Sequence, residues 1–393
     1  MSFRVGADAR SITPELSPAP YLAGFDSERM ATSVHDELMV RTIAIQHGNE
    51  EPWVLSSCDL IGLARVPRAE GRSLVCCTHT HHGPDTIGFW GRPLEGVSGR
   101  NPEYLDLVRL TVAASRDAAI ASLEAADLSA GSVSVPELVD NFRDPDVIDD
   151  ELSIVVATRA DQSVIATLAS YPCHPEVLDP ANTEITADYP GHFCRSVEGH
   201  RGGTAVFVAG GLGGMLSPRT EIHTHEEAER FGKVLAAAVD EVDLVAVGSG
   251  FSSEHSDVLV ELANPLYRLA MEMSIVDEVE WRDQMAVTEV SLTRIGDLVL
   301  AGVPGELLPK LGLQLKERLR SHGVRVPIIV GLANDELGYI LAREDFVTPE
   351  DYFDPGRQYE ESMSVGPDLG PAVMGALQRL TEVVCGPGVA GHG

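Results

Sequence analysis

The sequence predicts an α/β fold in which mixed β-sheets are layered with flanking helices. Short apolar runs typical of buried strands alternate with segments of helical periodicity along the chain. Two strand-like runs, 152–159 and 163–170, are separated by only three residues, which predicts a hairpin. The sheets should therefore contain antiparallel pairs and cannot be purely parallel.

The apolar runs and the helical patterns place the expected elements along the chain. Asn101 is a good N-cap and Pro102 a good first helical residue, so the clearest helix should run from there to about Ala126. Other helices are expected at 188–200, 226–241 and 305–321. Strands are expected at 39–45, 52–58, 72–77, 152–159, 163–170, 204–210, 285–295, 298–303 and 326–332.

Length and composition indicate an ordinary globular protein. The chain has 393 residues, of which 44% are hydrophobic and 23% charged, enough to bury a large core. With no repeats or low-complexity linker, we expect a single domain over 1–385 and a flexible tail over 386–393. The sequence does not indicate an oligomeric state.

The net charge and the lack of a recognisable targeting signal limit the classes of partner and the location that we expect. The net charge of −31 repels phosphate backbones, so we expect no nucleic-acid partner. The first residues contain no apolar signal region, and no apolar stretch is long enough for a transmembrane helix. Six irregularly spaced cysteines without a CxxC pair indicate neither a disulfide framework nor a thiolate zinc site. We therefore expect a cytoplasmic protein.

The stretch CCTHTHHGPDT, residues 76–86, places three histidines directly after a strand-like run. In an extended HxH, His79 and His81 point to one face and His82 to the other. Two imidazoles on one face can share a metal or divide the work between metal and substrate. A turn whose polar groups face water is an equally acceptable interpretation of this motif alone.

Three further candidates also follow predicted strands. His174 lies between two prolines, which fix its backbone; it could bind metal or simply pair with a backbone group. Glu306 is expected in the first turn of a helix, where an acid stabilises the helix dipole without any catalytic role. Tyr339 could be a ligand or a packing residue. Their shared position at strand ends favours a common site, because α/β folds collect ligands there.

The motifs together resemble a known family. VGADARSITP, VHDELMVRTIAI, SSCDLIGL, CCTHTHHGP, NFRDP, YPCHPEVL with ITADYPG, GGMLSP, VPGELL, LANDELGYI and QYEES occur in this order from residue 5 to about 370. This combination is similar to the catalytic domain of the neutral/alkaline, non-lysosomal ceramidases. That resemblance implies a zinc hydrolase that cleaves the N-acyl amide bond of ceramide with a metal-activated water.

Carried over residue by residue, the resemblance implies one zinc per chain. His79 and His174 would be its imidazole ligands, and Glu306 and Tyr339 would complete the set. His81 would be the unliganded histidine that contacts the scissile carbonyl. The resemblance also implies two further active-site residues, Arg143 of NFRDP and Tyr359 of QYEES, and adds a catalytic role for Tyr339. His82 receives no direct role.

Some features depart from the family pattern. The GDVSP element of the family reads GMLSP, so Met215 replaces an acid while Ser217 remains. A thioether cannot orient a polar neighbour as a carboxylate does. The carboxy-terminal immunoglobulin-like domain of the family is expected to be absent, because the chain stops soon after QYEES.

Composition also bears on the substrate. Aromatic residues make up 5% of the chain, and no basic amphipathic helix offers a membrane-docking face. The expected substrate is therefore either ceramide or a small non-sphingolipid amide, lactone or ester. A non-catalytic binding protein of the same fold is the alternative from a different functional class.

Two minor motifs are also present. A second HxH, His223 with His225, leads into a charged helix and is interpreted as solvated surface. Asp59 could orient a metal-bound histidine or cap a loop.

Overall fold

The computed structural model describes residues 3–65, 72–276 and 280–386. Within this part of the chain, strands form two large mixed sheets and three short pairs. The expected fold class, mixed sheets with flanking helices, is confirmed. The predicted tail over 386–393 lies, apart from Gly386, outside the described residues.

The larger sheet contains antiparallel and parallel neighbours. The predicted hairpin is its β8–β9 pair, whose strands run antiparallel, while β9–β11 and β4–β5 are parallel. In spatial order its strands are β11 (Thr204–Ala209), β9 (Val164–Tyr171), β8 (Glu151–Thr158), β6 (Glu124–Ser134), β1 (Phe3–Ser11), β3 (Met39–His47), β4 (Trp53–Cys58) and β5 (Ser73–Cys77), with β13 (Val245–Ala246) paired to β6.

The smaller sheet is built from the C-terminal third of the chain. Its strands are β14 (Phe251–Val260), β16 (Met285–Ile295), β17 (Leu298–Gly302) and β19 (Val326–Val330), with β15 (Glu280–Arg282) paired to β16. The short pairs are β2 (Ser33–Val34) with β10 (Glu184–Ile185), β7 (Val139–Asn141) with β12 (Leu216–Pro218), and β18 (Glu306–Leu307) with β20 (Tyr339–Ile340).

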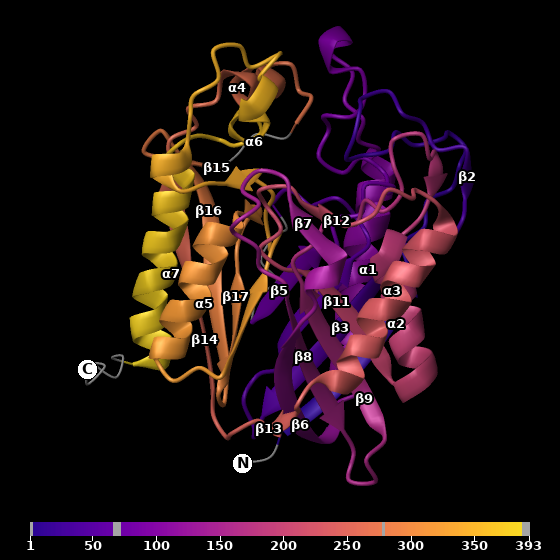
Figure 1. Ribbon diagram of the computed structural model, residues 1–393, viewed down its shortest axis with the longest axis vertical. Helices are drawn as coiled ribbons and strands as arrows, with labels where there is room; N and C mark the ends of the chain where they lie inside the picture. The colour runs from indigo at the N-terminus through magenta and orange to yellow at the C-terminus, as the bar shows by residue number, and fades with distance from the viewer. Residues whose placement is uncertain (1–2, 66–71, 277–279, 387–393) are drawn as a thin grey trace.

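Helices cover the outer faces of both sheets, as Figure 1 shows. The helices are α1 (Pro102–Ala121), α2 (Asp188–Arg201), α3 (His225–Ala238), α4 (Pro265–Glu272), α5 (Pro309–Ser321), α6 (Tyr359–Ser362) and α7 (Leu369–Cys385). One apolar cluster joins Leu168 and Val206 of the larger sheet to Leu300 and Ile328 of the smaller one. Further clusters fill the spaces under α2 and α3 and under α5 and α7. Burial of these faces stabilises a four-layer helix–sheet–sheet–helix arrangement.

Two predicted helix boundaries are wrong. The first helix ends at Ala121, because residues from Glu124 onward pair as β6 with β1 and β8. The helix expected from 305 begins at Pro309, since Glu306 and Leu307 pair instead with Tyr339 and Ile340. Glu306 therefore lies in a short strand and not in the first turn of a helix.

Three long strands, β1, β6 and β14, were not predicted. The sequence of β6, EAADLSAGSVS, is rich in alanine and serine and lacks the β-branched runs that mark a strand. The first seven residues of β14 are polar or only half-buried, because one of its faces meets solvent. In both strands pairing with neighbours decides the structure, and local propensity does not.

Candidate active site

His79 follows β5 and is fixed by backbone contacts. Its φ of 72° lies in the left-handed region, and its amide N–H donates to Leu60 O over 2.9 Å. Its Nδ1 lies 2.6 Å from Ile61 O. Because a carbonyl oxygen can only accept, Nδ1 carries a proton and donates to it, and Nε2 is the ring nitrogen left to face Glu306. A ring oriented in this way can bind a metal through Nε2.

His174 is held in the same way after β9. It is fully buried between Pro172 and Pro175. Its amide N–H and its Nδ1–H both donate to Leu216 O, over 2.7 and 2.9 Å. Two histidines from strands far apart in sequence thus present Nε2 to the same space.

Glu306 and Tyr339 lie opposite each other in the β18–β20 pair. Cross-strand partners put their side chains on the same face, so this small pair brings together two residues 33 positions apart. Glu306 Oε2 lies 3.0 Å from His174 Nε2 and 3.5 Å from His79 Nε2. The glycine loop after β11 makes close approach possible, since a Cβ at Gly213 would lie 2.5 Å from Glu306 O.

Electrostatics favour a positive charge beside Glu306. Burial opposes the charged form of His174, but the hydrogen bond to Glu306 raises the pKa of His174 to about 9. Burial likewise opposes the charge on Glu306, yet His79 and His174 lower its pKa to about 2. An ionised carboxylate between two imidazole Nε2 atoms is a donor set that fits a cation.

His81 joins the same cluster. Its ring centroid lies 5.1 Å from that of His79 and 5.6 Å from that of His174. Among the described residues, His79, His81 and His174 are the group whose ligand atoms all lie within 4.8 Å of one another. Two overlapping ligand sets are therefore available, one with three histidines and one in which Glu306 replaces His81. The two sets share His79 and His174.

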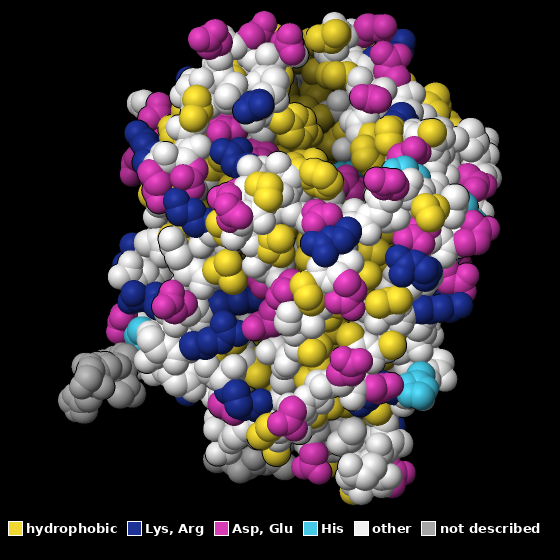
Figure 2. All heavy atoms as spheres, in the orientation of Figure 1, with side chains coloured by type: hydrophobic (Ala, Val, Ile, Leu, Met, Phe, Trp, Pro, Cys, Tyr) yellow, Lys and Arg dark blue, Asp and Glu magenta, His cyan; other side chains and the backbone are white. Residues whose placement is uncertain are grey.

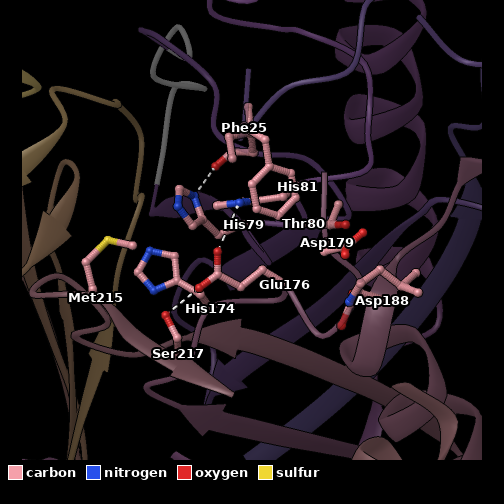
Figure 3. Close-up of polar contacts among 12 residues, drawn as sticks. Phe25, His79, Thr80, His81, His174, Glu176, Asp179, Asp188, Met215 and Ser217 are labelled. Atoms are coloured by element: carbon pink, nitrogen blue, oxygen red, sulfur yellow. Dashed lines mark hydrogen bonds and ion pairs between the residues drawn. The ribbon is translucent and has the colours of Figure 1, made fainter. Parts of the chain in front are cut away.

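A line of polar contacts leads away from His81. Its Nδ1 lies 3.4 Å from Glu176 Oε2, and the hydroxyl of Ser217 donates to the other oxygen of Glu176. Figure 3 shows the three histidine rings close together, with Glu176 between His81 and Ser217. Phe25 meets the His81 ring edge-on with a centroid distance of 4.8 Å. Burial, then the neighbouring His79 and His174, lower the pKa of His81 well below its usual value, so its imidazole is neutral.

Tyr339 and Tyr359 lie together at the opposite wall, with ring centroids 6.1 Å apart. The Tyr339 hydroxyl donates to Met215 Sδ over 3.6 Å. Met215 therefore still contacts a predicted site residue, although a thioether sulfur is a weaker acceptor than a carboxylate.

Arg143 lies behind this wall and does not line the pocket. It forms ion pairs with Glu360 and Glu361 and donates to Asp345 O over 3.1 Å. Both glutamates directly follow Tyr359 in α6. The contacts of Arg143 thus hold the helix that carries Tyr359.

Two other predicted candidates lie outside the cluster. His82 is buried, and its Nε2 lies 3.2 Å from Asp179 O. Asp59 accepts from the Met39 amide N–H over 2.9 Å. This contact corresponds to the loop-capping role, the second of the two roles considered for Asp59. Neither side chain lines the pocket.

His79, His81 and Glu306 of this cluster line a pocket of about 320 Å³. Figure 2 shows this region as a hollow with hydrophobic walls at the top of the molecule, between the loops around α4 and α6 and the N-terminal loops of Figure 1. The walls combine aromatic and aliphatic side chains with acids. They include Phe25, Asp26, Ile61, Ile87, Phe89, Trp90, Glu176, Met215, Tyr267, Glu336, Tyr359 and Met363.

Sequence reasoning missed three acids that line this pocket, Asp26, Glu176 and Glu336. Glu176 follows His174 by two residues, and a carboxylate so close to a candidate ligand was the available signal. Glu336 lies within the LANDELGYI motif, but nothing in its spacing indicated that it would face the pocket.

Known proteins resemble this chain in sequence and in fold. A neutral ceramidase of Drosophila melanogaster is 30% identical over 112 residues, a match that covers 27% of this chain and 14% of that protein. The crystal structure of neutral ceramidase from Pseudomonas aeruginosa superposes with a TM-score of 0.76 at 18% identity. A ceramidase complexed with C2 superposes with a TM-score of 0.79, also at 18% identity.

These structural matches extend over nearly the whole chain. They cover 98% of this chain and 74% and 76% of the two solved chains. No protein-family model matches the sequence. The resemblance drawn from the sequence motifs is thus confirmed by the solved structures, and the chain has the fold of the neutral ceramidases.

Proposed function

We propose that the protein is a zinc-dependent hydrolase that cleaves an N-acyl amide bond, as a ceramidase does. One observation carries the proposal: the Nε2 atoms of buried His79 and His174, each oriented by a backbone carbonyl, meet Glu306 Oε2 at the wall of a pocket. Two imidazoles and one carboxylate are a common zinc donor set in hydrolases. A binding protein of the same fold has no need of this arrangement.

His79, His174 and Glu306 would hold the zinc, and Tyr339 stands on the partner strand of Glu306 as the fourth candidate. Zinc bound there supplies a Lewis acid that lowers the pKa of a water and polarises the acyl carbonyl. His81 remains for the substrate in this assignment. Its Nδ1 faces Glu176, so its Nε2 is the atom left to hold a proton during attack or departure of the amine.

The residues around His81 position it and exclude water. Ser217 holds Glu176, whose Oε2 lies 3.4 Å from His81 Nδ1. Phe25 covers the ring from the N-terminal side. Tyr359, held in place by the ion pairs of Arg143 with α6, adds a hydroxyl to the opposite wall.

The size of the pocket favours a second candidate substrate class. A volume of about 320 Å³ is at the lower end of the range for small-molecule sites. A small non-sphingolipid amide, lactone or ester fits this volume, whereas the two long chains of ceramide would extend beyond it. No helix in the described part of the chain is long and apolar enough to cross a membrane.

A substrate panel tests the proposal. N-acyl sphingosines of several chain lengths, short-chain amides and lactones are incubated with protein stripped of metal and with protein reloaded with zinc. We expect amide hydrolysis that requires the reloaded zinc and that favours shorter acyl groups. Absence of turnover across the panel with zinc bound, or turnover unaffected by stripping, would contradict the proposal.

A further inference from the structure

An apolar groove lies between α1 and the edge of the larger sheet. β5 is the last strand of that sheet, and α1 packs mainly across β1 and β3. Leu105, Val108 and Val112, which share one face of α1, line the helix side of the groove. Val54 of β4 and Leu74 of β5 line the sheet side. The groove has a volume of about 210 Å³.

The groove is separate from the active-site pocket. Among the described residues, the two spaces have no lining residue in common. The loop after β4 borders both of them, since Ile61 lines the pocket whereas Leu63 and Arg65 line the groove. A ligand in the groove therefore does not contact His79 or Glu306.

The charged residues that line the groove are all basic. Within the described part of the chain they are Arg65, Arg109 and Arg116, and the lining contains no aspartate or glutamate. Over the whole chain, 60 acidic residues outnumber 29 basic ones, so an all-basic lining is unusual for this protein. Arg109 and Arg116 are about two turns apart on α1 and therefore lie on the same side of the helix.

The present partners of these arginines leave donors for a further anion. The surface ion pairs are Arg65 with Glu280, Arg109 with Asp106 and Arg116 with Asp117, over 3.0, 3.3 and 2.9 Å. Within the described residues, one N–H group of Arg109 and two of Arg116 are used in this way, out of five on each guanidinium. Exposed pairs contribute at most about 1 kcal/mol, so a carboxylate in the groove can share or replace them.

We propose that this groove is a second binding site, which takes an amphiphile with one short alkyl chain and a carboxylate head. The apolar walls bury the chain, and Arg109 and Arg116 bind the carboxylate, whose planar shape matches a guanidinium. The volume is below the usual range for small-molecule sites, so it suits one short chain and not a two-chain lipid. The inference does not rest on the proposed hydrolase function, although hydrolysis of an acyl amide releases an acid of this class.

Three probes with the same eight-carbon chain test the head group: octanoate, 1-octanol and octylammonium. Isothermal titration calorimetry on metal-stripped protein measures binding, so that no zinc can hold the carboxylate. We expect one octanoate per chain, with a Kd about 10-fold lower than that of octanol, the lower end of the range for a hydrogen bond to a charged group. Octylammonium should bind most weakly. Octanol or octylammonium binding as tightly as octanoate would overturn the inference.

Ala113→Trp places the ligand in the groove. Ala113 is exposed and lines the groove, whereas its neighbour Ala114 is exposed and does not. An indole at position 113 occupies the space of the alkyl chain, so octanoate affinity should fall by more than about 10-fold. Ala114→Trp should bind octanoate as the wild type does. If Ala113→Trp also keeps the wild-type affinity, octanoate binds elsewhere and the inference is wrong.

Arg109→Gln/Arg116→Gln tests the charge without filling the groove, and it decides the question even if Ala113→Trp does not fold. The advantage of octanoate over octanol should fall to within about threefold, while octanol affinity stays near the wild-type value. Arg320→Gln/Arg379→Gln removes the same charge from exposed side chains outside the groove and should keep the advantage. An advantage that survives in the first double variant contradicts the inference.

The outcome is independent of catalysis. Octanoate binding that is lost in the groove variants supports the second site even if no amide is hydrolysed. Amide hydrolysis by a protein that does not bind octanoate overturns the second site and leaves the proposed function standing.

Discussion

The chain contains two HxH motifs that look alike in sequence and differ in structure. His79 and His81 follow the end of β5, are buried, and converge with His174 from another strand. His223 and His225 lie at the start of α3, where Thr224 caps the helix. His223 is exposed, and the His225 ring stacks on His35 with centroids 3.6 Å apart.

The partners of the two motifs explain the difference. The Nδ1 of His79 is occupied by a backbone carbonyl, which leaves Nε2 for a cation. The Nε2 of His225 is already taken by Glu184 over 2.9 Å, and His223 Nδ1 donates to Val177 O over 2.8 Å. Spacing and an orienting carbonyl are therefore not enough for a candidate metal site, because His223 has both and is exposed. The first motif differs in that His79 and His81 are buried and converge with His174.

The largest expected effect breaks the first motif. His79→Ala or His174→Ala removes an imidazole from both available ligand sets, so metal affinity should fall by more than about 100-fold and hydrolysis with it. Titration with a chromogenic zinc chelator measures the affinity. Near-normal zinc binding in both variants would show that the cluster is not the metal site.

The next largest effect distinguishes the roles of the two histidines in the first motif. His81→Ala should retain about one zinc per chain and lose roughly 10²- to 10⁴-fold in kcat, the range for removal of a general acid–base group. Metal content and initial rates are measured on the same preparation. If His81→Ala instead empties the site, the ligand set is the three-histidine one, and our assignment of His81 to the substrate is wrong.

A smaller effect is expected at Asp188, which holds the loop that follows His174. It accepts the amide N–H groups of Val177, Leu178 and Tyr189. Burial raises its pKa from 3.8 to about 7. The folded protein therefore keeps this proton up to about pH 7, whereas the unfolded chain releases it near pH 4.

The sign of the pH dependence follows from that difference. The contribution of protonated Asp188 is fully present below about pH 4 and is lost as the pH rises through about 7. Because the pKa of Asp188 is higher by about three in the folded protein, its protonated form contributes at most about 4 kcal/mol to the free energy of unfolding. Urea unfolding should show that Asp188→Asn removes this slope between about pH 4 and 7, while exposed Asp127→Asn leaves it. An unchanged slope in Asp188→Asn would contradict this account.

The smallest effect is expected at the second motif. His225→Ala breaks a partly exposed ion pair with Glu184, so the free energy of unfolding should change by less than about 1 kcal/mol. Zinc content and hydrolysis should match the wild type. Loss of zinc in this variant would remove the contrast between the two motifs.

The sequence allowed the positions of the site histidines to be predicted because each follows a strong apolar run. His79 follows β5 and His174 follows β9, and strand ends of an α/β fold meet at one edge. The local environment of Glu306 was not predictable. Its strand β18 has two residues and exists through pairing with β20, a contact between distant segments.

The acids that were missed also depend on structure that the sequence does not display. The side chains of Glu176 and Glu336 face the pocket because of the loops around them, and a loop carries no periodicity to indicate direction. The long strands β6 and β14 lacked local propensity and depended on their neighbours. Tertiary pairing, which one sequence does not display, decided each of these features.

The most direct test of the central claim is the metal content of three purified proteins after expression with added zinc. Inductively coupled plasma mass spectrometry is applied to the wild type, to His79→Ala and to the double variant His223→Ala/His225→Ala. We predict about one zinc per chain in the wild type and in the double variant and nearly none in His79→Ala. A wild type without metal, or a His79→Ala protein with a full complement, would contradict the account.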